Sequence, residues 1–204
     1  MNLRISLFGL SLALTVCSYG QAIAGSPADA FQVRYASNLN IGDSVINITN
    51  AGTTNTAAGA LTNICVNVYT FAPDEQLISC CACNVTPNAL VSLSARGDLI
   101  SNTLTPAVPT SIVVKILASR QSTCNAAMPT ADVLAPGMRA WGTTLHATPT
   151  PGTWAVTETD FLQAGLSAGE LARITSFCGF IQANGSGFGI CRSCRFGGQG
   201  GVKQ

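Results

Sequence analysis

The sequence predicts a mainly β protein, a disulfide-stabilised antiparallel β-sandwich with one amphipathic helix near the C-terminus. Short segments of alternating apolar and polar residues, rich in Val, Ile and Thr, recur between turn residues up to about residue 158. Apolar residues at helical spacing stand out only near residue 170. Eight cysteines follow a segment typical of an export signal, so disulfides are expected to hold the domain together.

The expected strands share this alternation and are bounded by Gly, Pro, Asn or Asp. They cover 31–36, 44–49, 61–71, 76–85, 89–95, 99–104, 111–119, 140–148 and 153–159. Two hairpins are predicted, one turning at 72–75 and one at 149–152. Segment 111–119 is the most apolar and is expected in the middle of a sheet. Regularly spaced strands of this kind favour a sandwich or barrel over a Rossmann-type fold.

One helix is predicted after Ser167. Ser167 and Glu170 have the spacing of a capping box, and Leu166 and Leu171 occupy the positions of a hydrophobic staple. The predicted apolar stripe consists of Leu171, Ile174, Phe177, Cys178 and Ile181. This stripe is expected to pack on the sheet, with a disulfide from Cys178 to a strand.

The chain is expected to divide into three parts. Residues 1–24 have the layout of a secretory signal peptide, with Arg4, an apolar run over 5–16, and Ala22-Ile23-Ala24 before the cleavage point. A lipoprotein signal ending at Cys17 is disfavoured, since Val16 stands where a small residue is expected. Residues 25–159 are the predicted β-sandwich domain, and 160–204 are a helix plus a cysteine-bearing C-terminal arm packed on the same domain.

Export places the mature chain outside the cell, at the cell surface or in the periplasm. Removing the signal leaves 180 residues, nine acidic against nine basic, so the net charge is zero. A nucleic-acid partner is not expected, because nothing here supplies the basic field that phosphates require. No later segment is long and apolar enough to predict a membrane span. A chain this poor in charge does little to resist self-association.

The cysteines that remain after cleavage are expected to form disulfides. They are Cys65, Cys80, Cys81, Cys83, Cys124, Cys178, Cys191 and Cys194. On a strand Cys80 points away from Cys81 and Cys83, so all three are expected to bond to distant partners. If the first hairpin turns at 73–74, Cys65 lies opposite 81–83 and a bond to Cys81 or Cys83 is reasonable. The other cysteines would reach Cys124, Cys178 or the pair Cys191 and Cys194.

Metal binding and redox chemistry are disfavoured. Cys191 and Cys194 have zinc-knuckle spacing, but no second C-x-x-C pair accompanies them and His146 is the only histidine. The same C-x-x-C neither follows a predicted strand nor opens a helix, as a thioredoxin-like motif would. We therefore expect no metal and no other cofactor.

Catalytic residues are not predicted either. A serine hydrolase would have to recruit the single histidine, His146, and the chain has no G-x-S-x-G elbow. Glu158 and Asp160 share a strand face, which leaves two-carboxylate glycoside chemistry open. Acidic residues at strand ends are more often solvated, so an enzyme is not the expected class.

Four segments resemble a family of uncharacterised secreted bacterial proteins. They are Asn40-Ile41-Gly42-Asp43-Ser44, Ser79-Cys80-Cys81-Ala82-Cys83, the segment 140–147 (AWGTTLHA), and Gly187-Phe188-Gly189-Ile190-Cys191-Arg192-Ser193-Cys194. The resemblance spans most of the mature chain. It implies export and carries no activity with it.

These observations predict a structural or adhesive protein of the cell surface or medium, without catalytic activity and able to self-assemble. An exposed strand such as 31–36 could pair with the sheet edge of another copy. The alternative is a carbohydrate-binding module or secreted hydrolase. Its speculative glycan contacts are Trp141 and Trp154, which flank the second hairpin, with Glu158 and Asp160 beside them and Tyr35 and Tyr69 as further stacking rings.

Overall fold

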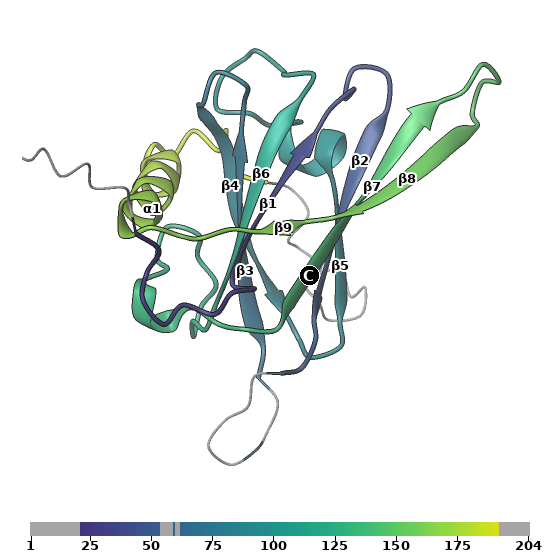
Figure 1. Cartoon of the computed structure of the whole chain (residues 1–204). Coiled ribbons are helices and arrows are strands. Elements are labelled where there is room, and N and C mark those ends of the chain that lie inside the picture. The colour runs from purple at the N-terminus through teal and green to yellow at the C-terminus, as the bar shows by residue number, and fades with distance from the viewer. Residues whose placement is uncertain (1–20, 54–58, 60–61, 192–204) are drawn as a thin grey trace, which may run out of the picture.

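The computed structural model describes residues 21–53, 59 and 62–191, and over these the chain forms two antiparallel sheets that face each other (Figure 1). The five-stranded sheet has the order β4 (Leu77–Val85), β3 (Ile64–Phe71), β6 (Ile112–Ser119), β1 (Phe31–Ala36), β9 (Leu162–Gln163). The four-stranded sheet has the order β5 (Leu90–Ser94), β2 (Asp43–Asn50), β7 (Met138–Ala147), β8 (Trp154–Asp160). The predicted mainly β fold with one C-terminal helix is confirmed.

The main apolar core lies between the sheets. Alternate residues of each strand point inward, and β-branched side chains fill the space, among them Ile46 and Ile48 of β2 and Val66 and Val68 of β3, all fully buried. The most apolar predicted strand is β6, which lies in the middle of its sheet between β3 and β1. Both predicted hairpins are also present, as β3–β4 and β7–β8.

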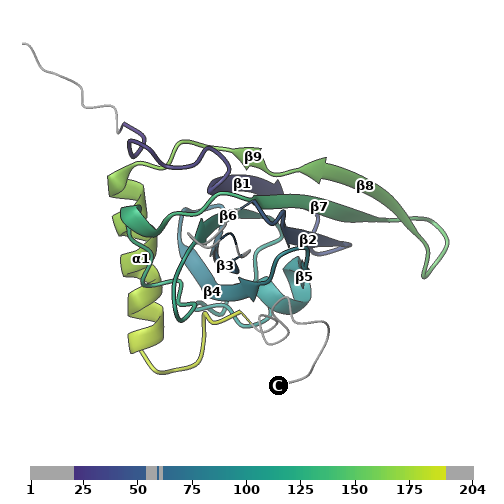
Figure 2. The same ribbon diagram turned by 90° about the horizontal axis from the view of Figure 1, so that it is seen from below.

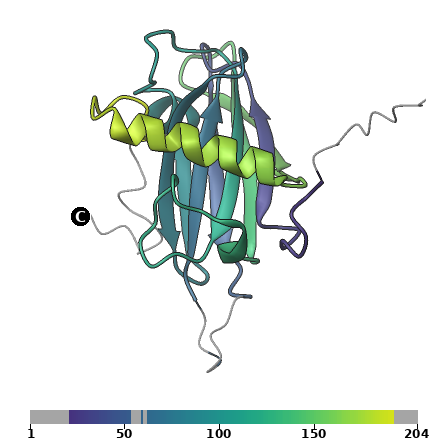
Figure 3. The same ribbon diagram turned by 90° about the vertical axis from the view of Figure 1, so that its left-hand side faces the viewer.

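A second apolar layer covers the outer face of the five-stranded sheet. Helix α1 (Ala168–Ala183) crosses the strands of this sheet, as Figure 3 shows. Ile174 and Cys178 of the helix are fully buried against a cluster that includes Tyr69 and Leu117. The Tyr69 hydroxyl donates to the Ala126 carbonyl at 2.7 Å, which ties the 120–137 loop to the sheet. Phe177 was predicted on the buried stripe, but it lies on the flank of the helix with 44% of its surface exposed.

The helix begins where the sequence predicts. The Ser167 hydroxyl accepts a hydrogen bond from the Glu170 N–H at 3.1 Å. The Glu170 carboxylate accepts hydrogen bonds from Lys115 of β6 and from Arg173 one turn along the helix, and so joins helix to sheet. Burial alone would raise the pKa of Glu170, but the hydrogen bonds and positive charges of Arg173 and Lys115 outweigh it and lower this pKa.

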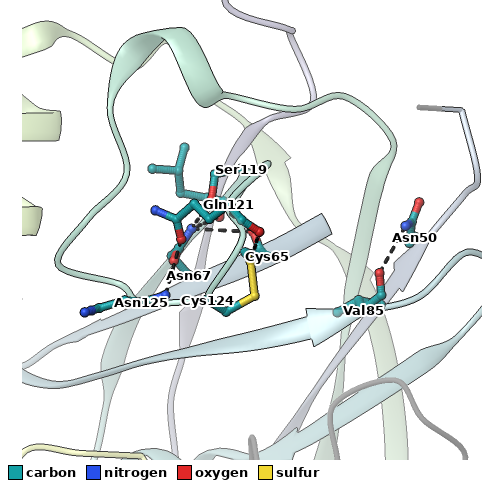
Figure 4. Close-up of a disulfide and its surroundings, with 9 residues drawn as sticks. Asn50, Cys65, Asn67, Val85, Ser119, Gln121, Cys124 and Asn125 are labelled. Atoms are coloured by element: carbon teal, nitrogen blue, oxygen red, sulfur yellow. Dashed lines mark hydrogen bonds between the residues drawn. A yellow bond between two sulfur atoms is a disulfide. The ribbon is translucent and has the colours of Figure 1, made fainter. Parts of the chain in front are cut away.

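Three disulfides attach the covering segments to the five-stranded sheet. Cys65 of β3 bonds to Cys124 in the 120–137 loop, shown in Figure 4 beside the Asn67 side chain. Cys80 of β4 bonds to Cys178 of α1, and Cys81 bonds to Cys191. Cys83 is disulfide-bonded as well, whereas Cys194 lies outside the described residues.

The predicted bond from Cys65 to Cys81 or Cys83 is wrong. Cys65 lies opposite Asn84 in the β3–β4 register, so its side chain points to the outer, helix-covered face. Cys81 and Cys83 point to the inner face, into the apolar core. The expected orientation of Cys80 away from these two is confirmed, as is the bridge from Cys178 to a strand.

Two further predictions differ from the structure. The segment 99–104 forms no strand, because the chain after β5 makes a π-helical turn (Ala95–Leu99) in which the Gly97 N–H donates to the Ser94 hydroxyl. The two-residue strand β9 was not expected, and it pairs with β1 at the edge of the five-stranded sheet. Most of the predicted signal peptide lies outside the described residues, while Ala22 forms a β-bridge with Ser167. No helix among the described residues is long and apolar enough to cross a membrane.

Replacing Cys80 and Cys178 together by alanine is expected to lower the free energy of unfolding by about 2–4 kcal/mol, since this disulfide closes a 98-residue separation in the unfolded chain. Urea unfolding of the oxidised double variant and the wild type measures the difference. A change below about 0.5 kcal/mol would mean that the helix is held by packing alone.

Candidate functional site

The sheets end in four edge strands, and three of them are protected. The β4 edge is covered by the chain itself, because the Cys80 N–H donates to the Gly189 carbonyl at 2.8 Å and the Leu104 N–H to the Ile78 carbonyl at 2.8 Å. Strand β9 has two residues and β5 has five. The β5 strand also ends in a cap, where the Ser94 N–H donates to the Asp98 carboxylate. Covering, shortness and a capped end each make an edge a poorer template for further strands than a longer open edge.

Strand β8 is the unprotected edge. All seven of its residues are exposed, on both faces of the sheet, including Trp154 (45%) and Val156 (57%). The β7–β8 hairpin extends beyond the sandwich, to the right in Figures 1 and 2. Within the described residues only β7 pairs with β8. Natural edges use charged residues, lysine above all, and proline to block pairing; β8 carries no lysine and no proline, and its charged residues are Glu158 and Asp160.

The register shows which backbone groups face this open edge. The Phe161 N–H donates to the Ala140 carbonyl, which makes odd-numbered residues of β8 the partners of β7. The N–H and C=O groups of the even-numbered residues therefore lie in the plane of the sheet and point away from β7, toward the open edge. These residues are Trp154, Val156, Glu158 and Asp160.

A polar seam lies beneath the base of this hairpin, where β1 faces β7. Arg34 of β1 is only 9% exposed, and its guanidinium donates to three hydroxyls at 2.8–3.1 Å. The acceptors are Ser44, Thr144 and Thr159. No carboxylate pairs with Arg34 among the described residues, and burial lowers its pKa. In this seam the positive charge of the Arg34 guanidinium is stabilised by hydrogen bonds to hydroxyl groups. The seam marks the end of the apolar core between the two sheets.

Gly142 makes room for this guanidinium. A Cβ at Gly142 would lie 1.9 Å from the Arg34 Cζ, so any larger residue collides with the buried group. The glycine sits in the middle of β7, where glycine is otherwise unfavourable because it adds no side-chain packing. Its presence is explained by the close approach of Arg34.

An open concavity of about 1150 Å³ lies beside the seam. It is lined by residues of β1, β7, β8 and β9, including Arg34, Tyr35, Trp141, Glu158, Asp160 and Leu162. The structure thus brings together three of the four speculative glycan contacts, Trp141, Glu158 and Asp160, with Tyr35 as a second aromatic ring. The Glu158 carboxylate accepts a hydrogen bond from the Thr143 hydroxyl at 3.0 Å.

Trp154 does not join this group. It lies opposite Ala147, six residues along β7 from Trp141, so the two indoles share a face of the hairpin but are about 20 Å apart. Tyr69 is fully buried beneath the helix and cannot contact a ligand. His146 is paired with the Thr157 hydroxyl on the hairpin, where no acid or serine contacts it within the described residues. Those residues also hold no group of three or more His, Cys, Asp or Glu side chains that could bind a metal ion.

No family model matches the chain, and no curated protein matches it significantly. Among solved structures, the crystal structure of Thermotoga maritima 1070 is similar over 67% of this chain and 94% of that one, with a TM-score of 0.41 and 9% sequence identity. A TM-score at this level does not indicate a shared fold.

Sequence reasoning missed two parts of this region. Arg34 stands in an alternating strand like any surface residue, and only the glycine in mid-strand at position 142 signalled that another group approaches there. The open edge was expected at 31–36, but β1 is paired to β6 along its length and to β9 at Gln32 and Val33. The exposed edge is instead β8.

Gly142→Ala is expected to lower the free energy of unfolding by about 1–3 kcal/mol, because the new methyl group displaces the guanidinium from its hydroxyl partners. In an Arg34→Ala background the same substitution should cost much less, since the colliding group is gone. A double-mutant cycle by urea unfolding measures this coupling. Gly169→Ala in the first turn of α1, where the new Cβ meets only the Ser167 hydroxyl at an ordinary contact distance of 4.0 Å, is the control and should not destabilise.

Equal costs of Gly142→Ala with and without Arg34 would show that the glycine serves another purpose than admitting the guanidinium.

Proposed function

We propose that this chain is a secreted or cell-surface structural protein that assembles by sheet-edge contacts and has no catalytic activity. The observation that carries the proposal is β8, an exposed seven-residue edge on a hairpin that extends beyond a disulfide-bonded domain. An open edge offers unpaired backbone groups to another chain, which is how strand addition holds partners together. The proposal includes membership in the family of secreted bacterial proteins that the sequence resembles.

The contrast with the other edges supports this proposal. A protein under pressure to stay monomeric protects each edge, and this fold does so at β4, β5 and β9. The nearly balanced charge of the chain adds no long-range repulsion between copies. Glu158 and Asp160 are the charged residues on β8, and both lie near its C-terminal end, so Trp154–Thr157 presents an uncharged edge.

Blocking the edge should weaken self-association. In Val156→Pro the lost N–H is one that faces the open edge, so the pairing of β8 with β7 is kept. The association constant of this variant should fall at least about tenfold, as one or two hydrogen bonds per contact are removed. Sedimentation equilibrium of mature protein across a wide concentration range measures the constant. Val156→Thr keeps both shape and N–H and serves as the matched control.

A strictly monomeric wild type at millimolar concentration would refute assembly, and equal association of the proline and threonine variants would place the contact elsewhere.

Carbohydrate binding is the second candidate, favoured by one observation: Trp141, Tyr35, Glu158 and Asp160 line one open concavity. Aromatic rings can stack on sugar rings, and carboxylates accept hydrogen bonds from sugar hydroxyls. A hydrolase would need both carboxylates to flank a glycosidic bond.

Under this second candidate, polysaccharide titration should quench tryptophan fluorescence of the wild type. Quenching should be lost in Trp141→Ala and kept in Trp154→Ala, because Trp154 lies about 20 Å from the concavity. A glycan array supplies the ligands to titrate. Absence of any binder on the array removes the candidate, and turnover that vanishes in Glu158→Gln would distinguish a hydrolase from a binding module.

A further inference from the structure

The open edge of β8 has a geometry that restricts how a second copy can pair with it. Its even-numbered residues direct their backbone N–H and C=O groups outward, so a partner strand must place its own outward groups against them. If that partner is another β8 running antiparallel, even residues face even residues. In each allowed register the sum of two facing residue numbers is therefore a constant even number. Moving to the next allowed register shifts the partner strand by two residues.

Three such registers overlap most of the strand, and charge separates them. Centring the pair on Glu158 places two Glu158 carboxylates directly opposite each other, which is unfavourable. Centring on Val156 leaves only 154–158 in contact and places Asp160 beside the turn. Centring on Thr157 pairs all seven residues, Trp154–Asp160, and sets each acid opposite an uncharged residue.

We propose that two copies of this chain join through their β8 strands, antiparallel, about a twofold axis that passes through Thr157. This inference rests on the proposed function and names its contact. Glu158 then faces Val156 of the second copy, and Asp160 faces Trp154 of the second copy. The two four-stranded sheets merge into one continuous eight-stranded sheet, and the contact is self-complementary, as a twofold axis requires.

The side chains of β8 fit this arrangement. The Glu158 carboxylate accepts a hydrogen bond from the Thr143 hydroxyl of β7 at 3.0 Å, which directs it back over its own sheet and away from the axis. Asp160 lies opposite Trp141 in the β7–β8 register. The row across the joined sheet therefore runs from Trp141 through Asp160 to Trp154 of the second copy. Trp154, which is 45% exposed in the single chain, gains a facing carboxylate that can accept from its indole N–H.

The concavity becomes part of this contact. Asp160 and Glu158 line it together with Tyr35 and Leu162, so the tip of the second copy's hairpin comes to lie at its edge. Leu162 is 73% exposed and Tyr35 is 60% exposed in the single chain. The second copy can therefore cover the exposed apolar surface of Leu162 and Tyr35. Burial of this surface would stabilise the dimer in addition to the backbone hydrogen bonds between the two β8 strands.

Cysteine cross-linking tests the register directly. Thr157 faces itself across the axis in a pair without mutual hydrogen bonds, where Cα atoms are about 4.5 Å apart, within the range of a disulfide. Ala155 of each copy lies four residues from its counterpart, about 13 Å away, and cannot bond to it. Both positions are exposed, on the same strand and on the same face.

Thr157→Cys and the matched control Ala155→Cys are equilibrated with oxidised glutathione at a concentration where wild type associates, and covalent dimer is measured on non-reducing gels. Most of the Thr157→Cys chain should become dimer, at least about tenfold more than for Ala155→Cys. Circular dichroism and a free-thiol count of one before oxidation confirm that each variant is folded with its native disulfides intact.

Equal cross-linking of the two variants, or more at position 155, overturns the twofold register. Wild type that associates while neither variant cross-links also overturns it but leaves assembly in place. Wild type that stays monomeric at every concentration refutes the proposed function itself, so the two failures are distinguishable.

Discussion

The disulfides of β4 are the constraint on which the rest of the fold depends. Because successive side chains of a strand point to opposite faces, Cys80 reaches outward to Cys178 of the helix while Cys81 reaches inward to Cys191. One strand thus holds both the covering helix and the segment that protects its own edge, where the Cys80 N–H meets the Gly189 carbonyl. Formation of these disulfides therefore holds the helix on this side of the sandwich and keeps residues near Gly189 paired with the edge of β4.

The opposite side of the molecule is built differently. There the apolar core gives way to the seam of Arg34, whose guanidinium is held by three hydroxyls over Gly142. Beyond the seam the β7–β8 hairpin extends without a second layer against most of its length, so β8 is exposed on both faces (Figure 2). Over the described residues, a disulfide-bonded body thus carries a seven-residue exposed edge at β8, and this arrangement supports the proposed self-association.

Local chemistry made much of this fold predictable from the sequence. Alternation and turn residues located both hairpins, and the Ser167–Glu170 spacing located the start of the helix to the residue. The pairing of Cys65 was not predictable, because a register shift at Thr70 and Phe71 decides whether Cys65 shares a face of the sheet with Cys80 or with Cys81 and Cys83. The open edge and the Arg34 seam depend on the order of strands in the two sheets. This order is a long-range property that the sequence pattern of a single strand does not predict.

Residue-resolved hydrogen exchange tests the central claim, that copies associate through the edge of β8. In a dilute sample the amides of Trp154, Val156, Glu158 and Asp160 should exchange fast, and in a concentrated sample they should become protected. The amides of the odd-numbered residues between them, already bonded to β7, should change little. Fast exchange of the even-numbered amides at every concentration, in a protein that nevertheless associates, would contradict the account.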